Sequence, residues 1–249
     1  MIKVLTDWAE IGAAVTSLQE RGLPMHETPQ KNWDHALLCE VLGALSPDAS
    51  IVDLGCGEGY TLALLHQLGF VKLSGVDFRV PWRARARLLL TMYRERTLSL
   101  PWRVRAGDIV GTPFRDESFE AAISVSTIEH GVNPQAFLEE ACRLLKQRGL
   151  LFVTTDYWEE KLTPTTIEKP FGLPWRVFCR EEIVAFVARA LTLGFTPLQG
   201  QEVPPCQERP VYWNGARYTF VAMAFRKGSR PCSTARPAES PTGSQLGAV

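Results

Sequence analysis

The chain has no apolar run of the roughly 18 residues that a membrane-crossing helix requires. Its amino terminus lacks the charged-then-apolar pattern of an export signal. The formal net charge is zero, so no overall charge favours nucleic acid or a membrane surface. Its six cysteines have neither the spacing of a zinc site nor that of a disulfide framework. These absences predict a cytoplasmic protein that does not associate with membranes.

The composition is that of an ordinary globular protein. Of its 249 residues, 45% are hydrophobic and 22% are charged. This length suits one large α/β domain with a tail. No internal repeat is visible. From residue 228 onward the chain is rich in Gly, Ser, Pro, Thr and Ala and cannot bury a core, so we predict a disordered tail over 228–249.

The most informative stretch is a short apolar run that ends in Asp53 and continues into three glycines on alternate positions, Gly55, Gly57 and Gly59. Glycines let the backbone turn tightly and approach a ligand that a Cβ would repel. A helical pattern follows, and its first N–H groups lack partners within the helix. A strand, a glycine turn and a helix form the first unit of a doubly wound sheet. Such sheets bind ligands beyond the carboxyl ends of their strands.

The spacing argues against a dinucleotide site, which has glycines at the first, third and sixth positions. Here the sixth position is Tyr60. An acid at Asp53 suits a ligand with a positively charged amine. This pattern resembles the first motif of the class I S-adenosylmethionine-dependent methyltransferases, acid-x-Gly-x-Gly-x-Gly. The resemblance implies S-adenosylmethionine as cofactor, bound by Asp53 and the glycine turn with Cys56 inside it.

The resemblance also assigns cofactor contacts to the ends of later strands. Asp77 lies 77 − 53 = 24 positions after Asp53, close to the separation of about 20 in Rossmann-type sites, and would accept hydrogen bonds from both ribose hydroxyls. Phe78 would pack against the adenine. Asp108 would bind the adenine amino group beside Ile109. The serines of the fourth strand, Ser124 and Ser126, complete the predicted cofactor-binding set.

The implied fold is α/β: a Rossmann-like, doubly wound sheet of seven strands, mostly parallel. We expect a C-terminal antiparallel hairpin made by Phe195–Leu198 and Tyr218–Phe225. The methyltransferase domain is predicted over 33–227, with residues 1–32 as a lid segment over the cofactor. The stretch from Thr112 to Glu120 resembles a proline–phenylalanine loop of the small-molecule branch, and we expect it to place Phe114 and Phe119 in the core.

The residues after the fourth strand lie next to the transferable methyl in the resembled family. His130 is our candidate base, because its unperturbed pKa is near 6.5 and it can take a proton from a hydroxyl. Glu129 would orient it or take part in binding. Some relatives hold a metal here with an additional acid, but this chain has Ser126 at that position, so we predict no metal site. The loop after the fifth strand adds pocket candidates: Asp156, Tyr157, Trp158, Phe171 and Trp175.

The predicted reaction is methyl transfer from S-adenosylmethionine to a small molecule, at a hydroxyl oxygen of a sugar or another metabolite. Two other functions remain open. Residues 79–105 contain eight arginines and one acid, which suits RNA or an anionic substrate but equally a solvated helix, so an RNA or protein methyltransferase is one alternative. A non-catalytic cofactor-binding protein is the other. The sequence identifies neither the acceptor nor the oligomeric state.

Overall fold

The computed structural model describes residues 1–163 and 169–229. The predicted tail over 228–249 therefore lies outside the described residues from position 230 onward. Nine strands and six α-helices occur in the described residues. The strands are β1 (Ile2–Val4), β2 (Ser50–Leu54), β3 (Lys72–Asp77), β4 (Arg103–Ala106), β5 (Phe119–Val125), β6 (Leu145–Tyr157), β7 (Phe195–Pro197), β8 (Val211–Trp213) and β9 (Ala216–Lys227). The helices are α1 (Trp8–Glu20), α2 (Lys31–Leu42), α3 (Tyr60–Gln67), α4 (Trp82–Glu95), α5 (Pro134–Leu144) and α6 (Arg180–Thr192), with a short 3-10 turn, η1 (Pro170–Gly172).

The strands form one sheet in the order β1-β9-β6-β5-β2-β3-β4, and β7 and β8 also pair with β9. The five strands from β6 to β4 run parallel to one another. Strand β9 is antiparallel to β6, β1, β7 and β8. The chain moves outward from β2 to β4 and then returns to the other side of β2 as β5. The strand order thus reverses between β2 and β5, which is where ligands bind in open α/β sheets.

The predicted fold class is confirmed: the sheet is doubly wound, mostly parallel and closed by antiparallel β7 and β9. Two strands, β1 and β8, add to the seven that we predicted. Each is only three residues long, too short for a detectable alternation of apolar and polar residues. Because β1 pairs with β9, the first residues of the predicted lid segment belong to the sheet itself.

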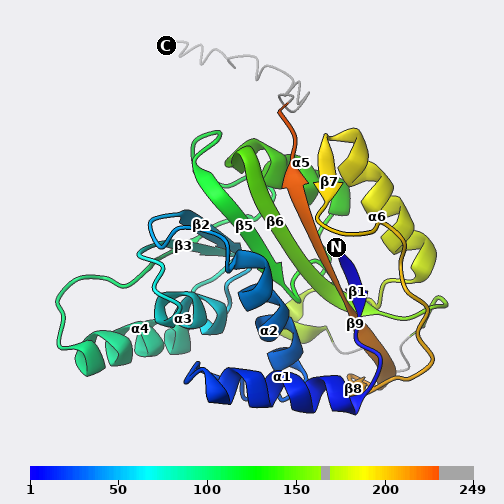
Figure 1. Ribbon diagram of the computed structural model, residues 1–249, viewed down its shortest axis with the longest axis horizontal. Helices are drawn as coiled ribbons and strands as arrows, with labels where there is room; N and C mark the ends of the chain where they lie inside the picture. Colours follow the sequence, from blue (N-terminus) through cyan, green and yellow to red (C-terminus); the bar gives the residue numbers. More distant parts are fainter. Residues whose placement is uncertain (164–168, 230–249) are drawn as a thin grey trace, which may run out of the picture.

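Helices cover both faces of the sheet (Figure 1), with α2 in front of the central strands and α5 behind them. Helix α1 packs on α2, and α6 packs on α5. Helix α5 begins where the sequence predicts, because the Asn133 side chain accepts hydrogen bonds from the N–H groups of Gln135 and Ala136. In the described part of the chain, no helix is long and apolar enough to cross a membrane.

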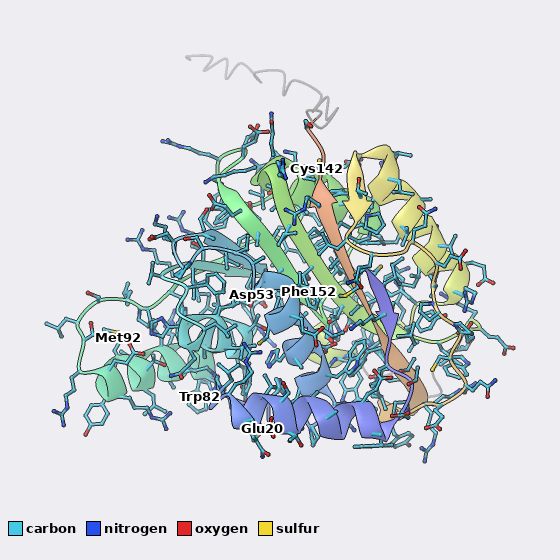
Figure 2. All side chains as sticks on the ribbon, viewed as in Figure 1. Glu20, Asp53, Trp82, Met92, Cys142 and Phe152 are labelled. Carbon is cyan, nitrogen blue, oxygen red and sulfur yellow. The ribbon has the colours of Figure 1, made fainter. Side chains whose placement is uncertain are left out.

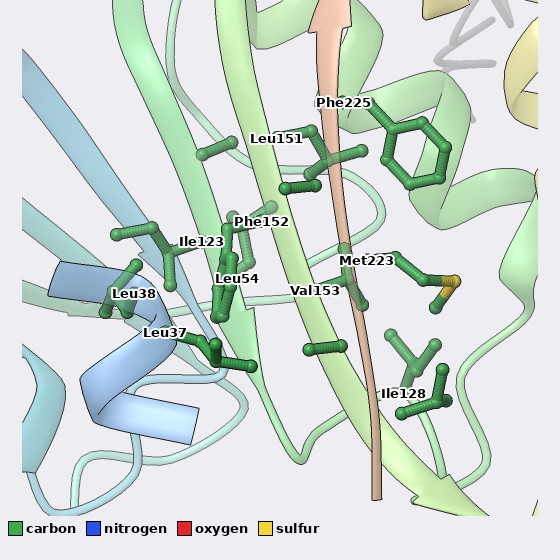
Figure 3. Packing of buried hydrophobic residues seen from close by; sticks show 14 of the residues in the cluster. Leu37, Leu38, Leu54, Ile123, Ile128, Leu151, Phe152, Val153, Met223 and Phe225 are labelled. Carbon is green, nitrogen blue, oxygen red and sulfur yellow. The ribbon is translucent and has the colours of Figure 1, made fainter. Parts of the chain in front are cut away.

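The hydrophobic core lies along the central strands. Figure 2 shows Asp53 and Phe152 in the middle of the molecule, surrounded by side chains from both helical layers. In the close view of Figure 3, Leu37 of α2 lies near the strands that carry Leu54 and Ile123. All of these apolar side chains are at most 6% exposed. A parallel strand with helices on both faces must be apolar on both faces, which explains the unbroken burial of β6 from Gly149 to Tyr157.

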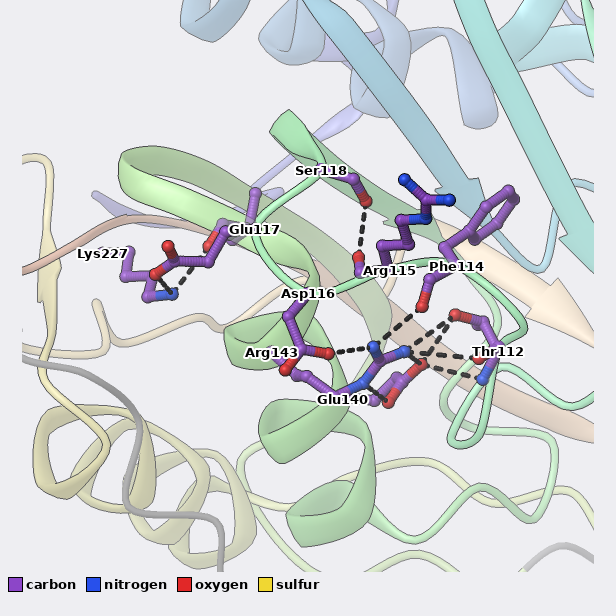
Figure 4. Close-up of polar contacts among 10 residues, drawn as sticks. Thr112, Phe114, Arg115, Asp116, Glu117, Ser118, Glu140, Arg143 and Lys227 are labelled. Atoms are coloured by element: carbon purple, nitrogen blue, oxygen red, sulfur yellow. Dashed lines mark hydrogen bonds and ion pairs between the residues drawn. The ribbon is translucent and has the colours of Figure 1, made fainter.

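The proline–phenylalanine loop is held by a single arginine of α5 (Figure 4). Arg143 donates to both carboxylate oxygens of Glu140, over 2.8 and 2.6 Å, to the Phe114 carbonyl over 2.8 Å and to Asp116 over 2.6 Å. Glu140 is only 4% exposed and also accepts from Thr112. The loop sets Phe114 against Phe119, with ring centroids 5.0 Å apart. Phe119 is buried and Phe114 packs against the core, as predicted.

We expect Arg143→Met to lower the free energy of unfolding by about 2–4 kcal/mol, because it leaves the buried Glu140 carboxylate without its cation. Chemical denaturation measures the change. Arg189→Met is the matched control. Arg189 pairs with Glu139 over 2.6 Å, but the two side chains are 39% and 34% exposed, so its loss should cost at most about 1 kcal/mol. Equal losses in the two variants would contradict the assigned role of Arg143.

Candidate active site

Functional side chains from four parallel strands meet at the point where the strand order reverses. Asp53 comes from the end of β2 and Asp77 from the end of β3. Ser126 follows β5, and Asp156 lies near the end of β6. Strands β6, β5, β2 and β3 are consecutive neighbours in the sheet. The topology therefore brings together residues that are up to 103 positions apart (156 − 53).

The glycine turn after β2 adopts backbone conformations that other residues rarely tolerate, with φ angles of 90° at Gly55, 45° at Gly57 and 79° at Gly59. The first and second glycines have different reasons to lack a side chain. A Cβ at Gly55 would lie 2.2 Å from the Thr127 side chain, whereas a Cβ at Gly57 would meet no atom within 4 Å. Gly55 thus permits close packing on the loop after β5. Gly57 leaves open space above the turn.

The Asp77 carboxylate joins β3 to this turn. It accepts hydrogen bonds from the Gly57 N–H over 2.9 Å and, more weakly, from the Arg79 N–H over 3.4 Å. Asp77 is 9% exposed, and burial raises the pKa of its carboxyl above the ordinary value. Each carboxylate oxygen can accept more than one hydrogen bond, so Asp77 keeps accepting capacity for a ligand.

Asp53 is the most unusual acid of the site. It is 1% exposed, and its Oδ2 atom has no hydrogen-bond partner. Burial, and then the neighbouring charge of Asp77, raise the pKa of its carboxyl to about 8. The two acids end neighbouring parallel strands, β2 and β3, and the charge of Asp77 acts on Asp53. A buried acid without a partner disfavours its own ionised form, and an incoming positive charge would relieve that cost.

The other predicted cofactor-binding residues have varied surroundings. Cys56 packs against Gly75 of β3, and burial followed by the charge of Asp53 raises the pKa of its thiol. Phe78 is 49% exposed, next to the guanidinium of Arg79. Asp108 is exposed and accepts from the Val110 N–H, while Ile109 is buried. The Ser124 hydroxyl donates to the Leu54 carbonyl and joins β5 to β2. Cofactor contacts of these residues stay predictions.

A charged cluster that the sequence did not reveal lies beside the end of β5. The Lys31 ammonium, at the start of α2, donates to the Ser126 hydroxyl and lies 3.9 Å from both Asp34 and Asp156. It also lies 3.8 Å from the centre of the Phe220 ring. Asp34 is fully buried, and burial raises the pKa of its carboxyl to about 7. Lys31 thus supplies the positive charge that partly balances several buried acids.

Asp156 and Glu129 extend this cluster. Asp156, a predicted pocket residue, accepts a hydrogen bond from the indole N–H of Trp175, another predicted pocket residue, over 2.9 Å. Glu129 is 1% exposed and accepts from the Thr155 hydroxyl over 2.9 Å. Burial, and then the charge of Asp156, raise the pKa of the Glu129 carboxyl well above its ordinary value. In the described part of the chain Glu129 forms no hydrogen bond with His130.

His130 lies half-buried among aromatic rings. Its ring centroid is 5.3 Å from that of Phe171 and 6.4 Å from that of Trp213, and Trp213 in turn contacts Trp175 at 5.0 Å. Burial, and then the charge of Lys31, lower the pKa of His130 to about 4. Its Nδ1 atom is buried without a hydrogen-bond partner. The imidazole is therefore neutral at pH 7 and can accept a proton.

The predicted lid segment contacts the glycine turn through one ring. His26 lies over Tyr60, with centroids 4.3 Å apart, and is tied to α2 because its backbone N–H donates to Asn32 over 2.8 Å. Trp33 of α2 is 3% exposed and donates its indole N–H to Glu10. Among residues 1–163 and 169–229, no group of three or more His, Cys, Asp or Glu side chains is arranged to hold a metal ion.

The family described as "Methyltransferase domain" matches residues 52–153, from the end of β2 into β6. A demethylmenaquinone methyltransferase of Tropheryma whipplei is 32% identical over 124 residues, which are 49% of this chain and 47% of that protein. A ubiquinone biosynthesis O-methyltransferase of Methylobacterium nodulans is 27% identical over 106 residues, 43% of this chain and 40% of that protein. The chain thus spans about half the length of the curated relatives that it matches.

Solved structures extend the likeness of fold beyond the matched segment. A geranyl diphosphate C-methyltransferase from Streptomyces coelicolor A3(2), in complex with Mg²⁺, geranyl diphosphate and S-adenosyl-L-homocysteine, superposes with a TM-score of 0.61. The similarity covers 83% of this chain and 84% of that one at 18% sequence identity. At this identity the likeness establishes the fold alone.

We expect Lys31→Met to destabilise the protein, and to do so more at pH 8 than at pH 5. The Lys31 charge lowers the carboxyl pKa values of Asp34, Glu129 and Asp156, so its loss raises them further in the folded state. The folded state then binds more protons than the unfolded state, and stability falls as pH rises through that window. Denaturation should show a loss of roughly 1–3 kcal/mol at pH 8.

Lys3→Met is the matched control for this variant. Lys3 pairs with Glu40 over 3.5 Å, with side chains 44% and 64% exposed, so its loss should cost less than about 1 kcal/mol. A pH-independent loss in Lys31→Met would show that Lys31 contributes by packing rather than by balancing the buried acids.

Proposed function

We propose that the chain transfers a methyl group from S-adenosylmethionine to a hydroxyl oxygen of a small molecule, and the match of residues 52–153 to the family described as "Methyltransferase domain" supports this. The observation that carries the proposal is the unpartnered carboxylate of Asp53 beside Asp77. A ligand with an ammonium group and a pair of hydroxyls matches these two acids. S-adenosylmethionine has both.

The residues present fit this cofactor. Asp53 would hold the ammonium of its methionine part, and Asp77 would accept from its ribose hydroxyls. The open space above Gly57 leaves the backbone of the turn accessible to a ligand. The predicted role of the glycine turn in cofactor binding requires this access. When bound, the cofactor supplies a methyl group already activated by a positively charged sulfur. The protein's tasks are then to align the acceptor, to exclude water and to manage one proton.

A hydroxyl acceptor is supported by the state of His130. Its imidazole is neutral at pH 7, so one ring nitrogen has a lone pair that can take the proton of an attacking hydroxyl. The rings of Phe171, Trp175 and Trp213 beside it offer flat apolar surfaces to a sugar or another hydroxylated metabolite. The relative from Methylobacterium nodulans, named as an O-methyltransferase, is consistent with transfer to oxygen.

Cofactor binding should release protons. With a pKa of about 8, Asp53 is mostly protonated at pH 7, and a ligand ammonium beside it favours the carboxylate. We expect S-adenosylmethionine to release up to about one proton at pH 7, measurable by calorimetry in buffers of different ionisation heat. Asp53→Asn should abolish this release and weaken binding by about tenfold or more. It should also stabilise the free protein by roughly 1–3 kcal/mol at pH 8.

Asp77→Asn is the matched control, since it should weaken binding while proton release persists. Absence of binding to the wild-type protein would overturn the proposed function. Undiminished proton release in Asp53→Asn would leave the function standing but remove the assignment of Asp53.

For catalysis, we expect His130→Asn to lower kcat by about 10²–10⁴-fold while the affinity for S-adenosylmethionine stays unchanged. The acceptor is found first, by incubating the protein with methyl-labelled cofactor and separate metabolite, RNA and protein fractions. With that acceptor, the wild-type kcat should fall only below about pH 5, since His130 protonates near pH 4. Label in the RNA or protein fraction alone, or an unaffected kcat in His130→Asn, would contradict this account.

A further inference from the structure

Helix α4 presents an apolar stripe that nothing in the described chain covers. Trp82, Ala86, Leu89 and Tyr93 follow one another at intervals of four, three and four residues, which places them on one helix face. Trp82, Leu89 and Tyr93 are 73%, 64% and 81% exposed. The one fully buried residue of the helix is Ala84. Figures 1 and 2 show α4, with Trp82 and Met92 labelled, at the outer edge of the molecule.

The segment that follows α4 adds to this surface. Leu98 is 97% exposed and Leu100 is 57% exposed. Single exposed apolar side chains are common, but a contiguous group of large ones is rare on the surface of a soluble monomer and marks a contact surface. A helix serving only to connect β3 to β4 would turn its Trp and Leu residues toward the protein.

Arginines border the stripe on both sides. At 100° per residue, Arg85 lies on one side, and Arg83 and Arg94 lie on the other. The acid of the helix, Glu95, lies on the face opposite the stripe, where it contacts His66 over 2.7 Å. In the described part of the chain, the exposed residues Arg85, Arg94 and Arg96 form no ion pair. Since the whole chain has a net charge of zero, this is a local concentration of positive charge.

Contacts of Arg87 and Arg83 fix the direction in which the stripe faces. Arg87 donates to the Glu58 carbonyl over 3.0 Å, and its guanidinium lies 3.6 Å from the centre of the Tyr60 ring. Arg83 pairs with the Glu58 side chain over 3.3 Å. These contacts bind α4 to the glycine turn, while the apolar stripe faces away from the protein.

We propose that α4 docks in the plane of an anionic lipid bilayer surface. Helices that lie in a membrane interface combine an apolar face that enters the headgroup region with cationic residues at its borders that contact lipid phosphates. Trp and Tyr are the aromatic residues favoured at that depth. A second copy of the chain is a poorer occupant, because two arginine-bordered faces would repel each other. A nucleic acid would use the arginines but not Leu89 or Leu98. The proposal differs from the sequence-based expectation that the chain does not associate with membranes, and the experiment below decides between the two.

The test is flotation of the full chain with vesicles of phosphatidylcholine alone or with about a third of phosphatidylglycerol. We expect binding only to the anionic vesicles, weakened by salt. The double variant Leu89→Ser with Tyr93→Ser should reduce binding by about tenfold or more. Charge reversal at Arg85 and Arg94 (R85E with R94E) should reduce it at least as much, since each arginine near an anionic surface contributes about 1 kcal/mol.

Matched controls lie elsewhere on the surface. Val184 and Leu191 of α6 are 51% and 40% exposed, so V184S with L191S removes two exposed apolar side chains away from α4. R21E with R148E makes the same charge change at two other exposed positions. Both controls should bind vesicles like wild type, and unchanged thermal unfolding and S-adenosylmethionine affinity confirm that each variant is folded.

Three outcomes would overturn the proposal. The first is absence of binding to the anionic vesicles. The second is undiminished binding by L89S with Y93S, which would mean adhesion through charge alone. The third is a dimer or an RNA complex that forms through α4 and is lost in the same variants, which would assign the surface to another partner.

Discussion

Two carboxylates held side by side at the ends of neighbouring strands constrain the rest of the site. Burial, and then the charge of Asp77, raise the pKa of Asp53, whose Oδ2 atom is buried without a hydrogen-bond partner. Such an arrangement is unfavourable in the free protein, and it persists because the surrounding sheet and helices fix β2 and β3. The glycine turn packs closely on the loop after β5, because a Cβ at Gly55 would lie 2.2 Å from the Thr127 side chain.

Much of the predicted cofactor site, made of Asp53, the glycine turn and Asp77, was predictable because its sequence motifs are local. A short apolar run precedes Asp53 and the glycines, and another precedes Asp77. The carboxyl ends of adjacent parallel strands lie at the same edge of the sheet. Lys31 was not predictable in the same way. Its partners Ser126 and Asp156 are 95 and 125 positions away (126 − 31 and 156 − 31), and nothing near Lys31 in the sequence indicates them. The family resemblance concerns motifs, and Lys31 belongs to none.

Other differences between the sequence-based prediction and the structure also have physical causes. Strands β1 and β8 are three residues long and form only because β9 offers unpaired edges and ends to them. Ser124 donates its hydroxyl to the Leu54 carbonyl and so joins β5 to β2, while its predicted cofactor contact stays a prediction. The arginine-rich segment was read from its charge alone, as a solvated helix or an anion-binding surface. Its apolar stripe could be interpreted as a contact surface only from the structure, in which Trp82, Leu89 and Tyr93 are exposed.

The aromatic rings around His130 come from a different stretch of the chain than Asp53, the glycine turn and Asp77. Phe171, Trp175 and Trp213 all lie beyond residue 153, where the family match ends. The two halves of the site are thus encoded in separate, consecutive blocks of sequence. Under the proposed function, insertions, deletions and substitutions in the later block would reshape the acceptor pocket while the earlier block continues to bind S-adenosylmethionine. Natural divergence, or grafting of that later block between homologues, can therefore change one partner of the reaction at a time.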